Sequence, residues 1–482
     1  MKSIFVVAMA DFNISAHGFA FAKLLNQKNN SELVVLEDLS TLFRSKESRE
    51  IFGKKTYITV SRVLLFISAI RYLFLLVTLR TSKNILSFRY GGELIGEHLY
   101  DALLRRYSIP TVKKLNFRQI FFCYVSFVFA LETAKKIKRM NIGRIYIQDN
   151  TYRQGLMLDI LKIFYSCELV SPLGYGTFTA SIQPLEVHSH QTLRHINVEQ
   201  FKKFQKSVDR TNIDTFLAKR FSGQGIDRDS KMAHAKKDTG SIIAARSAER
   251  IAVLVACHVF SDAPHAYARS VYGDYTHWFK AVVTSLSQSG LVDIYVKPHP
   301  SRSLYNEGNV VEKLLEELNI ENIRLGNFSH LLYSEDIDYV VTNGGTIGME
   351  AAALGIPVIS SSFSPYSDLG FSEHYKSAPA FEKRLAGLSS THRLDAKQIE
   401  DAGFALYYFY KHTAWDWADF SDTALEFGID ARDVEATLET KEAALSDIKN
   451  MMGGEFGINL AAKIEYISDS DIIMYGSLER DV

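Results

Sequence analysis

The sequence predicts an α/β protein made of two doubly wound units, each with a parallel sheet covered on both faces. Apolar runs typical of buried strands alternate with helix-like segments up to residue 185, and the same alternation restarts at residue 250. Between them lies a charged and polar stretch. At 482 residues, the chain is also too long for one ordinary core.

The first unit, residues 1–185, is expected to be a Rossmann-like domain. Its apolar runs and the segments between them predict the following elements: strands at 3–10, 32–38 and 144–149, and helices at 16–25 and 155–165. Residues 186–249 read first as a charged helix and then as a polar loop, so they are expected to connect the two domains.

The second unit, residues 250–395, is expected to be a second Rossmann-like domain. Its expected elements are strands at 250–257, 291–298, 337–342 and 356–361, and helices at 275–290, 308–320 and 346–355. Residues 396–482 are expected to be helical, to carry an aromatic patch at 404–417, and to pack back across the domains.

Charge and cysteine usage exclude several classes of function. Lys+Arg and Asp+Glu both number 55, so no global positive field would recruit nucleic acid. Cys123, Cys167 and Cys257 lie far apart, which argues against a disulfide framework or a zinc site and fits a reducing cytoplasm. Asp11 interrupts the N-terminal apolar run, so we expect a first buried strand there rather than a signal peptide.

Residues 58–80 are the most membrane-like stretch. Arg71 lies in its middle, where a charge costs about 2.5–3.5 kcal/mol on insertion scales, so a membrane span is disfavoured. At 100° per residue, one arc of the helix is apolar: Val63, Phe66, Ile67, Ile70, Leu73, Phe74 and Val77. A buried or half-buried helix is the favoured interpretation, and a helix lying on a membrane surface stays open. The apolar residues 119–130 are expected to belong to the core.

Polar residues gather where strands of the second domain end, and in open α/β sheets ligands bind outside the carboxyl ends of the strands. The candidate residues after the first two of these strands are His258, Ser261, Asp262 and His265, and then Lys297, His299, Pro300, Ser301 and Arg302. A third group follows the strand at 337–342: Asn343, Gly344, Gly345, Thr346 and Glu350.

The third group is the most specific. Gly344 and Gly345 free the backbone, Thr346 supplies a hydroxyl, and the helix that begins there offers N–H groups to a phosphate. Glu350 lies one turn into that helix and is expected to face the same opening. Taken singly, each residue also has an ordinary explanation in a tight turn, a strand exit or a loop. Three such loops at one sheet edge together favour a phosphate-bearing ligand.

Candidates for a catalytic base lie in the first domain. Asp11 and His17 follow the first strand, and Asp149 follows the strand at 144–149, so all three are expected at a sheet edge that faces a cleft. Asp11 could equally cap the helix after it, and Asp149 could belong to a simple turn.

Several of these stretches resemble a known family. "KPHPSR" at 297–302, followed by "VVTNGGTIGMEAAALGIPVI" at 340–359, is similar to the C-terminal half of bacterial capsule polysaccharide biosynthesis glycosyltransferases, a group that includes Kdo transferases. "HVFSDAPH" at 258–265 also looks like a segment of such enzymes. The resemblance is looser at 88–106 and 145–155, and it spans most of residues 85–410.

The resemblance implies a GT-B architecture, in which two Rossmann-like domains face each other across a cleft. The nucleotide-sugar donor, CMP-linked in the related Kdo-type enzymes, would lie on the C-terminal domain and the acceptor on the N-terminal one. His299–Pro300 and the Gly345–Thr346 turn then match the positions that hold the donor phosphate, and Arg302 could pair with the carboxylate of an acid sugar. Family members often carry two adjacent hydroxyl residues in this loop, whereas this chain has Gly344-Gly345-Thr346, in which backbone N–H groups could replace the missing hydroxyl.

The expected function is therefore transfer of a sugar, Kdo or a related acid sugar, to a surface polysaccharide or glycolipid. No DxD-type motif stands out, so a metal-independent mechanism without a cofactor is expected. The alternatives are a CDP-polyol phosphotransferase of the teichoic-acid type, a nucleotide-sugar epimerase, which the aromatic C-terminal region disfavours, and a non-catalytic sugar-phosphate-binding scaffold. The expected location is the cytoplasm, with peripheral contact at the inner face of the membrane left open by residues 58–80.

Overall fold

The computed structural model describes two compact α/β units. The described residues are 2–6, 32–36, 60–147, 151–172, 179–187, 196–222, 250–266, 271–320, 323–328, 334–413 and 465–467. Unit 1 holds the described residues up to 103, those of 113–187, and the strand at 465–467; unit 2 holds 104–112 and 196–410. The predicted α/β class with two Rossmann-like units is confirmed, and the cleft between them stays a prediction.

Unit 1 is built on a six-stranded sheet with the order β14-β7-β6-β5-β1-β2. Its strands are β1 (Lys2–Val6), β2 (Glu32–Leu36), β5 (Ile142–Ile147), β6 (Glu168–Pro172), β7 (Thr179–Pro184) and β14 (Glu465–Ile467). All neighbouring pairs are parallel except β6 and β7. The strand β14 corrects the expectation that residues 396–482 are helical throughout.

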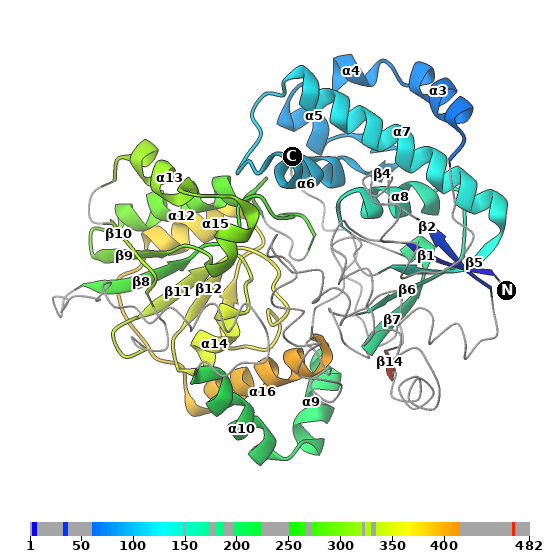
Figure 1. The fold of residues 1–482 in the computed structure, drawn as a ribbon. Coiled ribbons are helices and arrows are strands. Elements are labelled where there is room, and N and C mark those ends of the chain that lie inside the picture. Colours follow the sequence, from blue (N-terminus) through cyan, green and yellow to red (C-terminus); the bar gives the residue numbers. More distant parts are fainter. Residues whose placement is uncertain are drawn as a thin grey trace, which may run out of the picture. The chain divides into compact units, whose positions relative to one another are not determined.

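The helices of unit 1 include one long helix that covers this sheet together with α8 (Figure 1). These helices are α3 (Arg62–Arg71), α4 (Leu75–Thr78), α5 (Ser82–Leu86), α6 (Gly96–Tyr107), α7 (Phe117–Met140) and α8 (Tyr152–Lys162), and the long one is α7. Two short strands, β3 (Arg89–Tyr90) and β4 (Glu93–Leu94), form a separate hairpin. A capping box fixes the start of α7: Asn116 accepts from the Gln119 amide, and the Gln119 side chain accepts from that of Asn116. The expected helix 58–80 is in fact broken into α3 and α4.

Unit 2 has an entirely parallel six-stranded sheet in the order β10-β9-β8-β11-β12-β13. Its strands are β8 (Ile251–Ala256), β9 (Val292–Lys297), β10 (Ile323–Leu325), β11 (Tyr339–Thr342), β12 (Val358–Ser360) and β13 (Ser372–His374). Numbered along the chain, this is the order 3-2-1-4-5-6 of the Rossmann fold, whose direction reverses between β8 and β11.

Helices cover both faces of the unit 2 sheet. They are α9 (Val198–Ser207), α10 (Arg210–Phe221), α12 (Tyr275–Gln288), α13 (Val310–Leu318), α14 (Ile347–Ala353), α15 (Ala378–Ala386) and α16 (Ala396–Thr413). Alternate residues of β8 point to opposite faces: Val253 joins the core under α12 and α15, and Leu254 joins the core under α14 and α16. Figure 1 shows the two helical layers on either side of the sheet.

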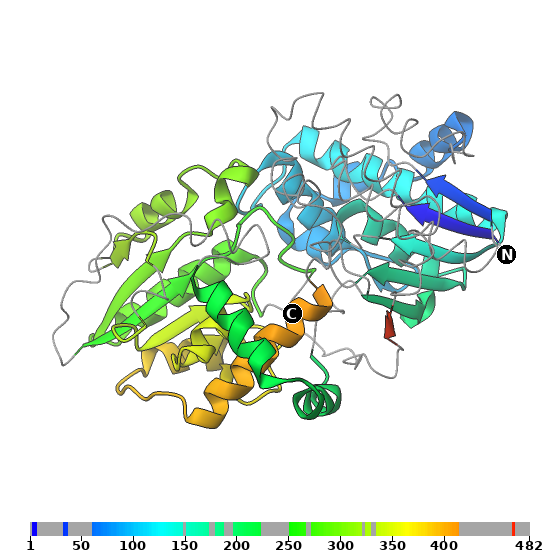
Figure 2. The ribbon, with the colours of Figure 1, turned by 60° about the horizontal axis from the view of Figure 1, so that its bottom comes forward.

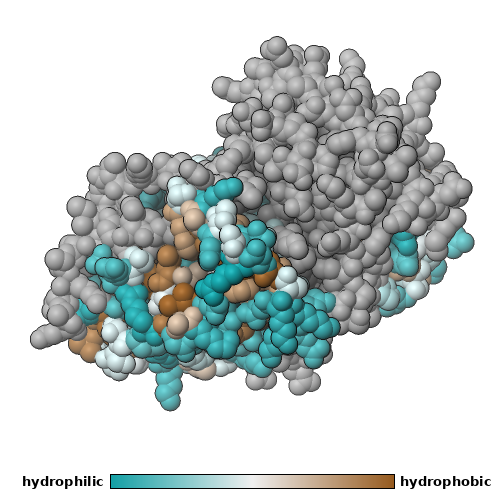
Figure 3. All heavy atoms as spheres, turned by 90° about the horizontal axis from the view of Figure 1, so that it is seen from below, coloured by the Kyte–Doolittle hydropathy of each residue, from teal (hydrophilic) through white to brown (hydrophobic). Residues whose placement is uncertain are grey.

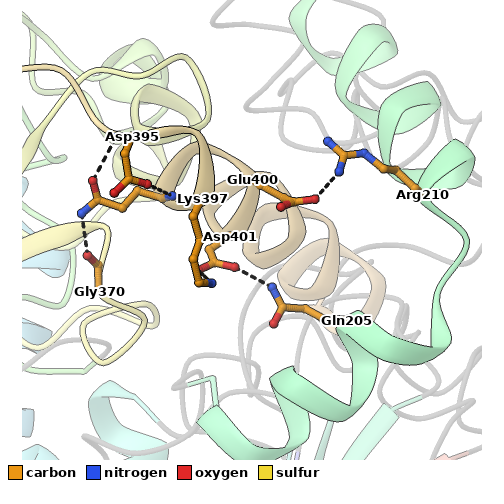
Figure 4. Close-up of polar contacts among 8 residues, drawn as sticks. Gln205, Arg210, Gly370, Asp395, Lys397, Glu400 and Asp401 are labelled. Carbon is orange, nitrogen blue, oxygen red and sulfur yellow. Dashed lines mark hydrogen bonds and ion pairs between the residues drawn. The ribbon is translucent and has the colours of Figure 1, made fainter.

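The expected connector and the C-terminal helix pack together within unit 2. The described part of residues 186–249 forms α9 and α10, and these lie beside α16 (Figure 2). Gln205 of α9 donates to Asp401 of α16 at 2.7 Å, and Arg210 of α10 pairs with Glu400 (Figure 4). Seen from below, side chains on this part of the surface are mostly hydrophilic, with apolar patches between them (Figure 3).

Candidate functional site

The fold brings three of the predicted loops to one edge of the unit 2 sheet. Strands β8, β9 and β11 are neighbours, and Ala256 pairs with Lys297 while Val255 pairs with Val341. The three strands therefore end at the same level. His258 follows β8, His299 follows β9, and the Gly344–Thr346 turn follows β11, so these loops meet where the strand order reverses.

His258 is the most unusual side chain of this edge. Its ring stacks on that of Tyr275 with centroids 4.7 Å apart and planes 7° apart, and the edge of Trp278 approaches it at 6.3 Å. Its Nε2 atom is buried and has no hydrogen-bond partner among the described residues. Burial, with a smaller contribution from His299, lowers the pKa of His258 from 6.5 to about 3, so the ring is neutral at pH 7.

Gly345 lies opposite this nitrogen. A Cβ atom at Gly345 would lie 3.3 Å from Thr342 Oγ1 and 3.5 Å from both Cε1 and Nε2 of His258, so a side chain at this position would pack directly against that nitrogen. The preceding Gly344 has φ +93°, a conformation that L side chains rarely adopt. The Gly345 amide donates to Thr342 Oγ1 at 3.3 Å, and its carbonyl accepts from the Tyr366 hydroxyl at 2.9 Å. The turn is thus held from both sides.

The backbone contribution is smaller than predicted. The amide of Gly345 is already used, and that of Gly348 donates to the Gly345 carbonyl at 3.0 Å. The helix expected at 346–355 is α14, which has seven residues and begins after Thr346. Any phosphate at this edge would therefore depend mainly on side chains.

His299 lies directly before a short 3₁₀ helix that has Pro300 in its first turn. It caps the 3₁₀ helix Pro300–Tyr305, with its Nδ1 accepting from the Ser301 amide at 3.2 Å. A neutral ring that accepts at Nδ1 carries its proton on Nε2, and so presents a donor there. The neighbouring Lys297 ends β9 and is buried. The structure thus brings two histidines and a lysine to adjacent strand ends.

Two predicted site residues are engaged elsewhere. Glu350 is buried and accepts from Arg220 Nε at 2.8 Å, while Arg220 also donates to the Tyr410 hydroxyl at 2.7 Å and lies over its ring. Arg302 donates to both carboxylate oxygens of Glu312, at 3.0 and 3.3 Å. The ion pair of Glu350 joins α14 to α10 and α16, so its carboxylate serves packing.

The loop after His258 is fixed by a buried carboxylate that sequence reasoning missed. Glu307 accepts from the Ser261 amide at 2.5 Å, and burial raises the pKa of its carboxyl group. Asp262 lies within 3.5 Å of the Tyr305 hydroxyl, and His265 is buried. These contacts hold the loop in place, which positions His258.

Asn343 is also a supporting residue. It is buried, its Oδ1 accepts from Ser361 Oγ at 2.5 Å, and its carbonyl accepts from Ser362 Oγ at 2.9 Å. The serine run at residues 360–362 is the sequence signal for this contact. Tyr275, Tyr366 and Glu307 carried no local signal, because each reaches the site from a different loop or helix.

The predicted bases of unit 1, Asp11, His17 and Asp149, lie outside the described residues. The strands before them are neighbours, since Val6 at the end of β1 pairs with Ile147 at the end of β5. The described residues hold no group of three or more His, Cys, Asp or Glu side chains that could bind a metal ion.

Comparisons with known proteins add a general likeness in fold. No protein-family model and no curated protein matches the chain. A KpsC β-Kdo 2,7 transferase from Thermosulfurimonas dismutans is 14% identical, with a TM-score of 0.31 over 57% of this chain and 90% of that one. The β-Kdo 2,4 transferase of the same KpsC is 11% identical, with a TM-score of 0.31 over 55% and 79%. A UDP-GlcNAc 2-epimerase from Methanocaldococcus jannaschii is 10% identical, with a TM-score of 0.28 over 85% and 100%. Similarity at this level leaves the assignment of function to the chain's own residues.

Proposed function

We propose that this chain is a glycosyltransferase that binds a nucleotide-sugar donor at the carboxyl ends of β8, β9 and β11. The observation that carries the proposal is the Nε2 atom of His258, which is buried without a partner among the described residues and lies beside Gly345. A buried nitrogen without a partner is costly, and a ligand phosphate oxygen would satisfy it by accepting a hydrogen bond when Nε2 carries a proton.

The residues around it suit a phosphate that leaves with the nucleotide. His299 presents an Nε2–H donor, and Lys297 adds positive charge nearby. An anion next to His258 would favour its protonated form and so offset the burial that keeps it neutral. Donors placed where charge develops on the leaving group are a major catalytic contribution, so we propose a metal-independent transfer.

The finer assignments rest on the resemblance of "KPHPSR" and its partner stretch. They are a CMP-linked donor, Kdo or a related acid sugar, and a surface polysaccharide or glycolipid acceptor bound by unit 1. The base would be Asp11, His17 or Asp149. Because Arg302 already pairs with Glu312, a sugar carboxylate would have to share its guanidinium.

The experiment is a thermal-shift panel with CMP, CDP, UDP, GDP and ADP. Wild type is compared with His299→Ala, with Gly345→Ala, and with a control, His392→Ala, which removes an exposed histidine beside Tyr339 at the amino end of β11. A ligand at 100 times its Kd stabilises the native state by about 2.7 kcal/mol. We expect one nucleotide to raise Tm in wild type and control and to have little effect on the other two variants.

The outcomes separate the competing functions. Selective stabilisation by CMP supports the acid-sugar donor, and stabilisation by CDP supports the polyol phosphotransferase. A response to UDP discards the acid sugar. Binding without release of nucleotide in the presence of activated sugar and acceptor extract supports the scaffold. If no nucleotide at millimolar concentration shifts wild type, the proposed donor site is wrong.

A further inference from the structure

The segment 58–80, for which a buried or half-buried helix was favoured, exposes its apolar arc. Of the twelve large apolar residues that are exposed in the described part of the chain, ten lie on α3, α4, the turn between them and the first half of α7. We call this set the α3–α4–α7 face: Val63, Phe66, Ile67, Ile70, Leu73, Phe74, Val77, Phe117, Phe121 and Val125. Scattered exposed apolar residues are ordinary, but a concentration of this kind marks a surface for interaction.

Two helical stripes form the face. Val63, Phe66, Ile67 and Ile70 follow the i, i+3, i+4, i+7 spacing of one side of α3, and Phe117, Phe121 and Val125 follow the i, i+4, i+8 spacing of α7. Tyr124 links the stripes, because its ring lies 6.1 Å from that of Phe121 and its hydroxyl donates to the Ala69 carbonyl in α3. Figure 1 shows α3 and α4 beside α7 on one side of unit 1.

Polar contacts fix the orientation that turns the apolar stripe outward. Ser68, on the opposite side of α3, is buried and donates to Glu132 of α7 at 2.6 Å. Glu132 is itself buried and accepts from Lys135 at 2.6 Å. Turning the apolar stripe of α3 toward α7 would remove Ser68 from a buried carboxylate, which costs free energy. The exposed stripe is therefore a built feature of unit 1.

The charges around the face have one sign. Residues 60–92 and residues 108–131 contain no Asp or Glu, although the chain as a whole has no net charge. The exposed cations of these two stretches are Arg62, Arg71, Arg80, Lys83, Arg89, Lys113, Lys114 and Arg118. The backbone of Leu115 donates to the Arg80 carbonyl at 3.0 Å, which brings the cations after α4 close to those before α7.

We propose that the α3–α4–α7 face docks on an anionic lipid surface and lies in the headgroup region with its cations on the phosphates. An apolar stripe bordered only by Lys and Arg matches the chemistry of such a surface. Insertion is shallow, because α3 has ten residues and no helix in the described part of the chain is long and apolar enough to cross a membrane. This proposal is independent of the donor site, which lies in unit 2.

The test is flotation of the full chain with phosphatidylcholine vesicles, with and without about one third phosphatidylglycerol, at low and high salt. The apolar variant combines Phe66→Ser, Ile70→Ser and Phe74→Ser. The charge variant combines Arg62→Gln and Arg80→Gln. The matched control combines Leu291→Ser and Leu325→Ser, which removes the two exposed large apolar residues of unit 2. All changed side chains are exposed, so melting temperatures should stay close to wild type.

We expect wild type and control to float with the anionic vesicles, and high salt to weaken this binding. The apolar variant should bind at least about 10-fold more weakly, and the charge variant roughly 5-fold more weakly for each cation removed. Equal binding to neutral and anionic vesicles, or unchanged binding by both variants, would overturn the proposal. So would a wild type that fails to float but self-associates in sedimentation while the apolar variant is monomeric, because the occupant would then be a second copy.

Discussion

Replacing His258 by Phe should change how the stability of unit 2 depends on pH. The pKa of His258 is about 3 in the folded chain and 6.5 in the ordinary, unfolded state. Below pH 6.5 the unfolded chain therefore binds a proton that the folded chain does not bind until the pH approaches 3. Lowering the pH from 6.5 toward 3 therefore favours the unfolded chain of wild type. The variant has no titrating group at this position, so it does not lose this part of its stability.

The size of the effect follows from the two pKa values. Between pH 7 and pH 5, a group with these values costs the native state about 2 kcal/mol relative to the unfolded chain. Phe keeps a ring that can stack on Tyr275. Its own effect on packing is present at both pH values and cancels when the wild-type and variant differences are compared.

The assay is urea unfolding of wild type and His258→Phe at pH 7 and pH 5, followed by circular dichroism and tryptophan fluorescence. We expect the free energy of unfolding of the variant, relative to that of wild type, to be about 2 kcal/mol higher at pH 5 than at pH 7. His258→Asn, which also cannot titrate, should show the same gain despite a different stability at pH 7. A difference that stays constant with pH in both variants would refute the burial of a neutral His258.

Further perturbations test the glycine turn, the ion pair of Glu350, and the burial of a cysteine in unit 1. Gly344→Ala should destabilise unit 2 by about 1 kcal/mol because of its φ of +93°, whereas Gly345→Ala should leave Tm nearly unchanged and remove nucleotide binding, as thermal melts with ligand can show. Arg220→Met should cost about 3–5 kcal/mol in urea unfolding by stranding Glu350, and adding Glu350→Met should recover much of that loss. Burial raises the pKa of Cys167 to about 12, so iodoacetamide at pH 8 should label it far more slowly than it labels the unfolded chain, as mass spectrometry can follow.

The strands β1, β2, β5, β8, β9, β11 and β12 were predictable, because each is a short apolar run with turn residues after it, whereas β6, β7 and β14 of the unit 1 sheet were not predicted. The runs at 250–257, 291–298, 337–342 and 356–361 became β8, β9, β11 and β12 within two residues at each end. β10 and β13 were missed because they have three residues each and are only partly buried. A strand so short leaves no period for a pattern to show.

Residues 58–80 show where hydrophobic periodicity is insufficient. The pattern located the apolar arc of α3 correctly, and the favoured interpretation was a buried or half-buried helix. The helix is partly buried, but the arc that it exposes is the apolar one. Periodicity reports which residues share a side, and the choice of the side that faces the core depends on a partner. Here the partner is Glu132, which is distant in sequence and accepts a hydrogen bond from Ser68. The apolar residues 119–130 were expected in the core, and most of them are buried, whereas Phe121 and Val125 are exposed.

The candidate site was predictable in position and less so in detail. Strand ends at a switch point identify His258, His299 and the Gly344–Gly345 turn without knowledge of their contacts. Ion pairs with other elements determine the remaining contacts: Glu350 pairs with Arg220, and Arg302 pairs with Glu312. No local pattern distinguishes a carboxylate or a guanidinium that faces a ligand from one that meets a partner on another helix.

The cost of holding His258 neutral is itself an argument for function. A buried imidazole whose Nε2 has no partner among the described residues destabilises unit 2, and a smaller apolar residue at this position could pack against Tyr275 without that penalty. The anion that we propose to bind beside Gly345 would reverse the balance, because it would supply the missing hydrogen bond and favour the charge that burial opposes. The interaction that the folded chain lacks would then contribute to ligand affinity. A residue that costs stability in this way is expected at a binding site and not in a core selected for stability alone.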